Sequence, residues 1–212
     1  MDRALAASRG RVRAAALLLA ALSLALALAA DSFAGGGRYT ISGGTKEQRT
    51  QVRLALEAST FDWGLIPREV QINIRRGVPA QSRPGEIWLD ARLLSSGAFS
   101  WSVVQDEYAH QIDYFLLGDE ARSILNEALG GRVWCRTEIA NLPHAAYGCE
   151  RFASTVVWSY WQDAQNAYRP RGPADESAAM APDLFRALLD RLLGVATPVR
   201  RALLLHPDGS RR

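Results

Sequence analysis

The strongest constraint on the fold is a segment near the middle of the chain that places ionisable residues in an otherwise apolar helix. Residues 101–117 read WSVVQDEYAHQIDYFLL. At about 100° per residue, Asp106, His110 and Asp113 share one face of a helix, and Glu107 lies beside them. The other faces are largely apolar, which predicts a helix packed inside a core. Because a buried charge is costly unless it is paired or binds a metal, this face is either a metal site or a solvated polar stripe.

The same segment resembles the H-E-x-x-H helix of zincin metallopeptidases. In that family two histidines one turn apart bind zinc, and the glutamate is the general base that activates water. The resemblance implies that Glu107 is the catalytic base and that His110 is the second metal ligand. The first ligand position holds Asp106, so the motif is a degenerate D-E-x-x-H.

A second match lies downstream, where residues 147–153 read YGCERFA. This stretch is similar to the E-x-F-A sequence that supplies the third, carboxylate ligand in glutamate zincins. The resemblance implies that Glu150 projects back toward His110 and completes a metal site with Asp106. The structural alternative is that Glu150 only complements the dipole of its helix. The whole layout is similar to small secreted bacterial zincin-like proteins and covers residues 72–161.

Two further residues are candidates for supporting roles. Asp113, about one turn beyond His110, would either accept a hydrogen bond from a metal ligand or form a salt bridge with an arginine. His144 would replace the missing histidine ligand, or it would be an exposed loop residue. One imidazole with two carboxylates is a harder donor set than two imidazoles with one carboxylate. The expected ion is therefore Zn²⁺ or another divalent ion such as Mn²⁺, and a site without metal is the alternative.

The first 30 residues are typical of an export segment. Three arginines between positions 9 and 13 precede an unbroken apolar run, residues 14–30, which ends in small residues at A-x-A spacing. Cleavage would give a secreted protein, whereas an uncleaved run would be a membrane anchor at the lower edge of spanning length. Both place the domain outside the cytoplasm. Residues 1–30 contain four Arg and one Asp, so their removal lowers the formal charge from +3 to zero. No nucleic-acid partner is therefore expected.

Cysteine usage agrees with export. Cys135 and Cys149 are the only two cysteines, and in an oxidising compartment they are expected to form a disulfide. Such a bridge would stabilise the fold by roughly 3 kcal/mol in the chain-entropy model.

The pattern along the chain predicts a helix-dominated α+β domain with a small sheet placed early. Residues 31–44 are rich in Gly and Ser and are expected to be a linker, residues 45–196 the zincin-like domain, and residues 197–212 a basic tail. Short apolar patterns predict strands at 70–74 and 86–90. Helices are expected at 46–59, from 95 or 100 to 117, and at 119–129, 147–167 and 175–194.

Three functions are consistent with these patterns. The first is an exported metal-dependent peptidase that acts on a polypeptide substrate. The second is a zincin fold without metal, a pseudoenzyme that binds or scaffolds an envelope protein. The third is a helical structural domain whose motif match is accidental. The zincin interpretation requires Asp106, His110 and Glu150 to surround one point beside Glu107. It also expects residues 87–90 to be the exposed edge strand with which a substrate peptide pairs.

Overall fold

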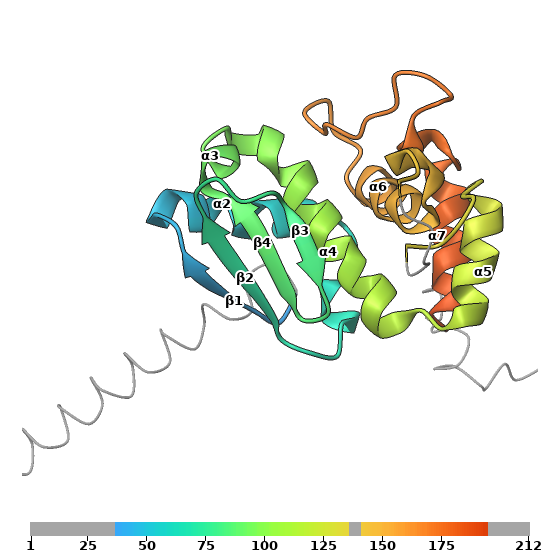
Figure 1. The fold of residues 1–212 in the computed structure, drawn as a ribbon, viewed down its shortest axis with the longest axis horizontal. Helices are drawn as coiled ribbons and strands as arrows, with labels where there is room; N and C mark the ends of the chain where they lie inside the picture. Colours follow the sequence, from blue (N-terminus) through green and yellow to red (C-terminus); the bar gives the residue numbers. More distant parts are fainter. Residues whose placement is uncertain (1–36, 136–140, 195–212) are drawn as a thin grey trace, which may run out of the picture. The chain divides into compact units, whose positions relative to one another are not determined.

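The computed structural model describes residues 37–135 and 141–194. The predicted export segment 1–30, the first part of the predicted linker and the basic tail lie outside these residues. Within the described part, the chain is α+β with more helix than strand, as the sequence predicts (Figure 1). None of the helices in this part is long and apolar enough to span a membrane.

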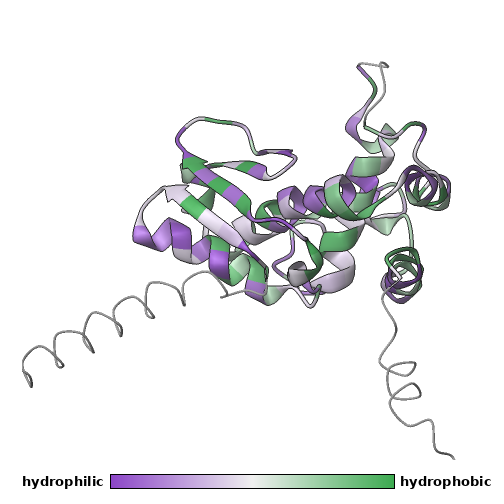
Figure 2. Cartoon of the chain, turned by 90° about the horizontal axis from the view of Figure 1, so that it is seen from below, coloured by the Kyte–Doolittle hydropathy of each residue, from purple (hydrophilic) through white to green (hydrophobic). Residues whose placement is uncertain are grey.

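A four-stranded sheet with the order β1-β2-β4-β3 forms the first half of the domain (Figure 1). Its parallel strands are β1 (Tyr39–Gly43), β2 (Val70–Arg75) and β4 (Glu86–Asp90), and β3 (Gln81–Arg83) pairs antiparallel with β4 at the edge. Ile72 in the centre pairs with Ile41 and Ile87. Hydrophobic and hydrophilic residues alternate along the strands (Figure 2). One face of the sheet therefore packs on the core.

Residues 31–44 were expected to be a linker, and strand β1 shows that this prediction is wrong for residues 39–43. Tyr39 is only 3% exposed, and its ring meets that of Tyr108 edge-on at 6.3 Å. Gly43, which ends the strand, has a φ of 76°, and a Cβ there would lie 2.4 Å from the carbonyl oxygen of Ile74. The glycines thus permit a tight exit from a core strand, and the domain begins before residue 45.

Helices follow the predicted order with different bounds. They are α2 (Lys46–Ala58), the short α3 (Ala91–Leu94), α4 (Trp101–Leu116), α5 (Asp119–Ala128), α6 (Gly148–Tyr160) and α7 (Pro182–Leu192). Helix α6 ends earlier than residue 167 because the side-chain amide of Asn166 donates to the carbonyls of Val157 and Trp161. Helix α7 begins at Pro182 because proline fits the first helical position and disfavours helix in the residue before it.

Helix α4 lies at the centre of the packing. Val104, Tyr108 and Ile112 are buried in the same core cluster as the inward residues of β2 and β4. Gln105 donates to the carbonyl of Ala55 at 2.7 Å and so joins α4 to α2. On its other side α4 packs against α6, and α6 in turn contacts α5 and α7 (Figure 1).

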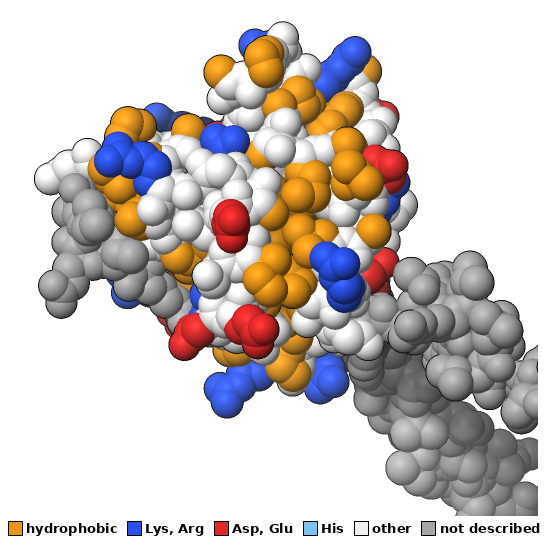
Figure 3. All heavy atoms as spheres, turned by 90° about the vertical axis from the view of Figure 1, so that its right-hand side faces the viewer, with side chains coloured by type: hydrophobic (Ala, Val, Ile, Leu, Met, Phe, Trp, Pro, Cys, Tyr) orange, Lys and Arg blue, Asp and Glu red, His pale blue; other side chains and the backbone are white. Residues whose placement is uncertain are grey.

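The face that carries α5 and α7 exposes hydrophobic side chains between charged ones (Figure 3). Leu184 of α7 is 62% exposed and Ile124 of α5 is 38% exposed. The ionisable cluster of α4 lies instead in the middle of the domain, between α4 and α6.

Candidate metal centre

Packing of α4 against α6 brings the three predicted metal ligands together. Asp106 and His110 lie one turn apart on α4, and Glu150 lies in the first turn of α6. One ligand atom from each lies within 4.8 Å of the other two. The Nε2 atom of His110 is 3.4 Å from Oε2 of Glu150. Glu150 therefore faces α4. An interaction with the dipole of its own helix would not by itself require this orientation.

These residues line a hollow of about 360 Å³ at the surface of the domain. Asp106 and Glu107 are each 7% exposed and His110 is 9% exposed, so the ionisable groups lie at its base. Gln81 and Ser82 of β3 also line the hollow. A ligand in the hollow would thus contact both the edge of the sheet and the predicted catalytic residues.

The strand beside the hollow corrects the expectation that residues 87–90 form the exposed edge. Strand β4 lies between β2 and β3, and β3 is the edge. Its three residues are polar and follow Pro79 closely, so no alternation of apolar residues identifies them. Gln111 of α4 fixes this edge: its amide donates to Ser82 Oγ and to the carbonyl of Arg83, and its carbonyl accepts from the backbone N–H of Gly85.

One atom in the cluster has an unmet hydrogen-bonding need. Within the described residues, the Oδ1 atom of Asp106 is buried and has no hydrogen-bond partner. A buried polar atom left unsatisfied costs about 1–3 kcal/mol. A divalent cation would satisfy it, since carboxylate oxygens and imidazole nitrogens are both ligands of Zn²⁺ and Mn²⁺. The residues present therefore fit a metal ion held by Asp106, His110 and Glu150.

The two neighbouring carboxyls of α4 titrate far above their usual range. Burial raises the pKa of Asp106 to about 7, and the charge of Glu150 adds to this effect. Burial also raises the pKa of Glu107 to about 8, with a further contribution from the charge of Asp106. Because burial penalises the charged form, both groups would gain from a cation nearby.

The histidines and Glu150 shift in the direction of an ion pair. Burial opposes the charging of His110, but its hydrogen bond to Glu150 and the nearby Asp106 outweigh burial and raise its pKa to about 9. Burial alone would raise the pKa of Glu150, but hydrogen bonds from His110 and His144 lower it to about 2. Without a metal, protons on the two imidazoles thus balance the carboxylate.

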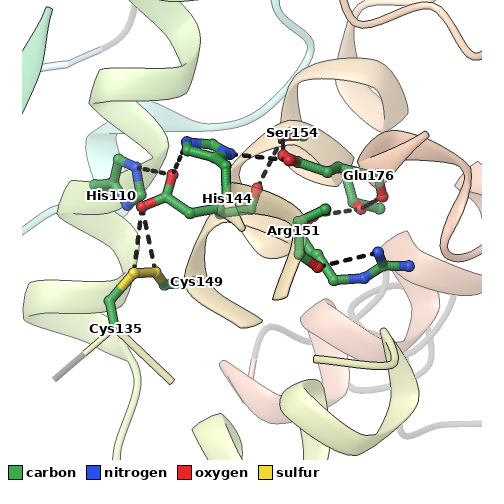
Figure 4. Close-up of polar contacts among 10 residues, drawn as sticks. His110, Cys135, His144, Cys149, Arg151, Ser154 and Glu176 are labelled. Carbon is green, nitrogen blue, oxygen red and sulfur yellow. Dashed lines mark hydrogen bonds and ion pairs between the residues drawn. A yellow bond between two sulfur atoms is a disulfide. The ribbon is translucent and has the colours of Figure 1, made fainter. Parts of the chain in front are cut away.

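His144 lies beside the three ligands but outside their group. Its Nε2 is 3.1 Å from Oε2 of Glu150, and its Nδ1 is 2.9 Å from Oε1 of Glu176 (Figure 4). Ser154 donates to the other oxygen of Glu176 at 3.0 Å. The side chain of His144 is 63% exposed. His144 is therefore held between two glutamates. The third member of the ligand group, beside His110 and Glu150, is Asp106 and not His144.

Asp113 forms the salt bridge that was one of its two alternatives. Its Oδ1 accepts from Arg122 Nε at 2.7 Å and from Trp134 Nε1 at 3.1 Å. Among the described residues it has no hydrogen bond to His110. Asp113 thus takes the salt-bridge alternative: the carboxylate joins α4 to α5 and to the segment before Cys135.

Two residues of the site were not predicted from the sequence. Glu176 lies in the 3-10 helix η4 (Glu176–Ala178) and holds His144. The hydroxyl of Tyr168 interacts with the carboxyl of Asp106, and burial followed by the charge of Asp106 raises the pKa of Tyr168. Both belong to the irregular segment between α6 and α7, where no motif or periodic pattern marks them.

Comparison with known proteins gives no match: no family model, curated protein or solved structure is similar to this chain. The zincin resemblance consequently depends on the two motifs and on the geometry described above.

Proposed function

We propose that this chain is an exported zincin-type metallopeptidase in which Asp106, His110 and Glu150 hold a divalent ion. The observation that carries the proposal is the convergence of these three residues, together with a buried oxygen of Asp106 that lacks a hydrogen-bond partner among the described residues. The disulfide between Cys135 and Cys149 supports a location outside the cytoplasm. The proposed substrate of this peptidase is a polypeptide.

Glu107 is the general base of the proposed reaction. A divalent ion in such a site supplies Lewis acidity, which polarises a peptide carbonyl and makes water a stronger acid. Glu107 lines the same hollow and is adjacent to Asp106 on α4, so its carboxylate can take a proton from water there. Without a metal, burial raises its pKa to about 8. A bound cation would lower this pKa toward neutrality, the range in which a general base is most effective.

The edge of the sheet supports a polypeptide as the substrate. Gln81 and Ser82 line the hollow, and β3 pairs with β4 on one side only. A substrate in extended conformation can add to such an edge through backbone hydrogen bonds. Gln111 fixes β3 against α4, so the peptide bond would lie at a set distance from Glu107.

Hydrolysis of an unfolded polypeptide by matched variants tests the proposal. We expect the wild-type protein supplied with Zn²⁺ or Mn²⁺ to cleave denatured casein. Glu107→Gln should lower the rate at least about 100-fold because the base is lost, while calorimetric titration shows metal affinity little changed. The control is Glu57→Gln, which alters an exposed glutamate on α2 and should behave as wild type. Equal rates for Glu107→Gln and wild type, or no hydrolysis by the metal-loaded wild type, would contradict the proposal.

One observation favours a second candidate, a pseudoenzyme that binds an envelope protein without metal. The pKa values of His110 and His144 are raised to about 9 and about 10. At neutral pH these imidazoles are therefore protonated and compensate Glu150 without an ion. This candidate predicts that the native chain takes up neither Zn²⁺ nor Mn²⁺, whereas the peptidase binds at least one of them.

A further inference from the structure

The disulfide lies against the same carboxylate as the two histidines (Figure 4). The Oε1 atom of Glu150 is 3.2 Å from Sγ of Cys135 and 3.5 Å from Sγ of Cys149. A disulfide sulfur carries no hydrogen, so these are close contacts without a hydrogen bond to stabilise them. The other oxygen of Glu150 contacts His110. The carboxylate thus lies between the predicted metal site and a pair of sulfur atoms.

These separations are the ones that ligands of a single ion require. With a zinc–sulfur bond of about 2.3 Å and a zinc–oxygen bond of about 2.0 Å, tetrahedral geometry places sulfur and oxygen about 3.5 Å apart. One donor atom from each of Cys135, Cys149 and Glu150 lies within 4.8 Å of the others. Two thiolates on one tetrahedral zinc ion lie about 3.8 Å apart. Once their bond opens, the two sulfurs must therefore separate before the three donors can surround an ion.

We propose that the reduced chain binds Zn²⁺ through Cys135, Cys149 and Glu150, at a second site that shares Glu150 with the first. Thiolates are soft ligands that favour Zn²⁺, whereas the set of Asp106, His110 and Glu150 is harder. Because the two thiolates exist only in the reduced chain, the state of the disulfide decides whether this second metal site is available. The proposal does not depend on peptidase activity.

The bridge is open to a reductant of the dithiol class. Cys135 is exposed and lines the hollow, whereas Cys149 is buried in the first turn of α6. Attack by a dithiol on the sulfur of Cys135 breaks the S–S bond and releases the sulfur of Cys149 as a thiolate, which the helix N-terminus stabilises. The reductant's second thiol then frees Cys135, and the reductant is oxidised to its own disulfide. The two protons of the reductant pass to the cysteine sulfurs or to solvent during reduction, and binding of Zn²⁺ as the dithiolate leaves both of them in solvent.

Anaerobic titration with Co²⁺ tests this site, because cobalt bound by thiolate has a charge-transfer absorption in the near ultraviolet. We expect this band in the full chain reduced with a dithiol, after removal of the excess reductant, and no such band in the oxidised chain. One equivalent of Zn²⁺ should abolish the band. Zinc affinity of the reduced chain should be at least about tenfold tighter than that of the oxidised chain.

Three variants separate the second site from the first and from binding by an unfolded chain. Cys135→Ala/Cys149→Ala should lack the band in every state, and Glu150→Gln should weaken cobalt binding by the reduced chain about tenfold or more. Asp106→Ala should leave the band of the reduced chain unchanged even if the peptidase proposal is wrong. A reduced wild type without the band would overturn the inference. So would a band that Glu150→Gln leaves unaffected, or one that forms while circular dichroism shows an unfolded chain.

Discussion

The affinity of the proposed metal centre is expected to rise steeply with pH. His110 binds a metal only as the neutral imidazole, yet its contacts with Glu150 and Asp106 raise its pKa, against the effect of burial, to about 9. At about pH 7, therefore, roughly one chain in 100 has a neutral His110. As pH rises toward 9, the apparent dissociation constant should fall about tenfold per pH unit, which corresponds to about 1.4 kcal/mol per unit.

His144 is expected to make this dependence steeper. Its hydrogen bonds to Glu150 and Glu176 raise its pKa to about 10. A cation bound to Glu150 neutralises the first of these anions, so the proton on His144 is held less tightly and part of it is released on binding. The His144→Ala variant lacks that contribution. It should bind metal with a shallower pH dependence and release fewer protons than wild type.

Calorimetric titration of the oxidised protein with Mn²⁺ measures both quantities. Experiments between about pH 6 and about pH 8, each in two buffers of different ionisation enthalpy, give the dissociation constant and the number of protons released. We expect the constant to fall at least about 100-fold over this range, with at least one proton released per ion. Equal affinity at the two ends of the range, or binding without proton release, would refute the assignment of His110 as a ligand.

Three other changes have defined outcomes. Asp113→Ala should destabilise the fold by about 1–3 kcal/mol in urea unfolding, because Arg122 and Trp134 lose the buried carboxylate that accepts their hydrogen bonds. Asp119→Ala removes the exposed partner of the same arginine and should have little effect. Asp106→His should raise zinc affinity by restoring two imidazoles to the site, and unchanged affinity in a calorimetric titration would argue against a ligand at this position. Mass spectrometry of the exported protein under non-reducing conditions should find both thiols blocked, and two free thiols would contradict the disulfide.

Elements with regular apolar spacing are predictable from the sequence. Strands β2 and β4 appear within two residues of their expected bounds, and helix α4 does so for the start at residue 100 rather than 95. Buried side chains must follow the period of the element that carries them. The same periodicity places Asp106 and His110 on one face of α4. Their meeting with Glu150 could be expected only through the resemblance to zincins, since no local pattern specifies how α6 packs against α4.

Other parts of the fold and site depend on contacts that sequence patterns do not encode. Strand β3 is too short and polar to be recognised, and its position depends on hydrogen bonds from Gln111. Tyr168 and Glu176 reach the site because α6 ends near Tyr160. The side-chain amide of Asn166 favours this end, since it donates to the carbonyl of Trp161. Each of these placements results from tertiary packing, so helix and strand propensities could not locate them.

Metal content of the purified, oxidised protein tests most directly whether Asp106, His110 and Glu150 hold an ion. Protein supplied with Zn²⁺ and Mn²⁺ at about pH 8 and then freed of unbound metal can be examined by elemental analysis beside Asp106→Ala and Asp119→Ala, the second variant being a control for loss of a carboxylate. We expect about one ion per chain in wild type and in Asp119→Ala, and almost none in Asp106→Ala. Folded wild-type protein that retains no metal, or no more than Asp106→Ala, would contradict a metal centre at this position.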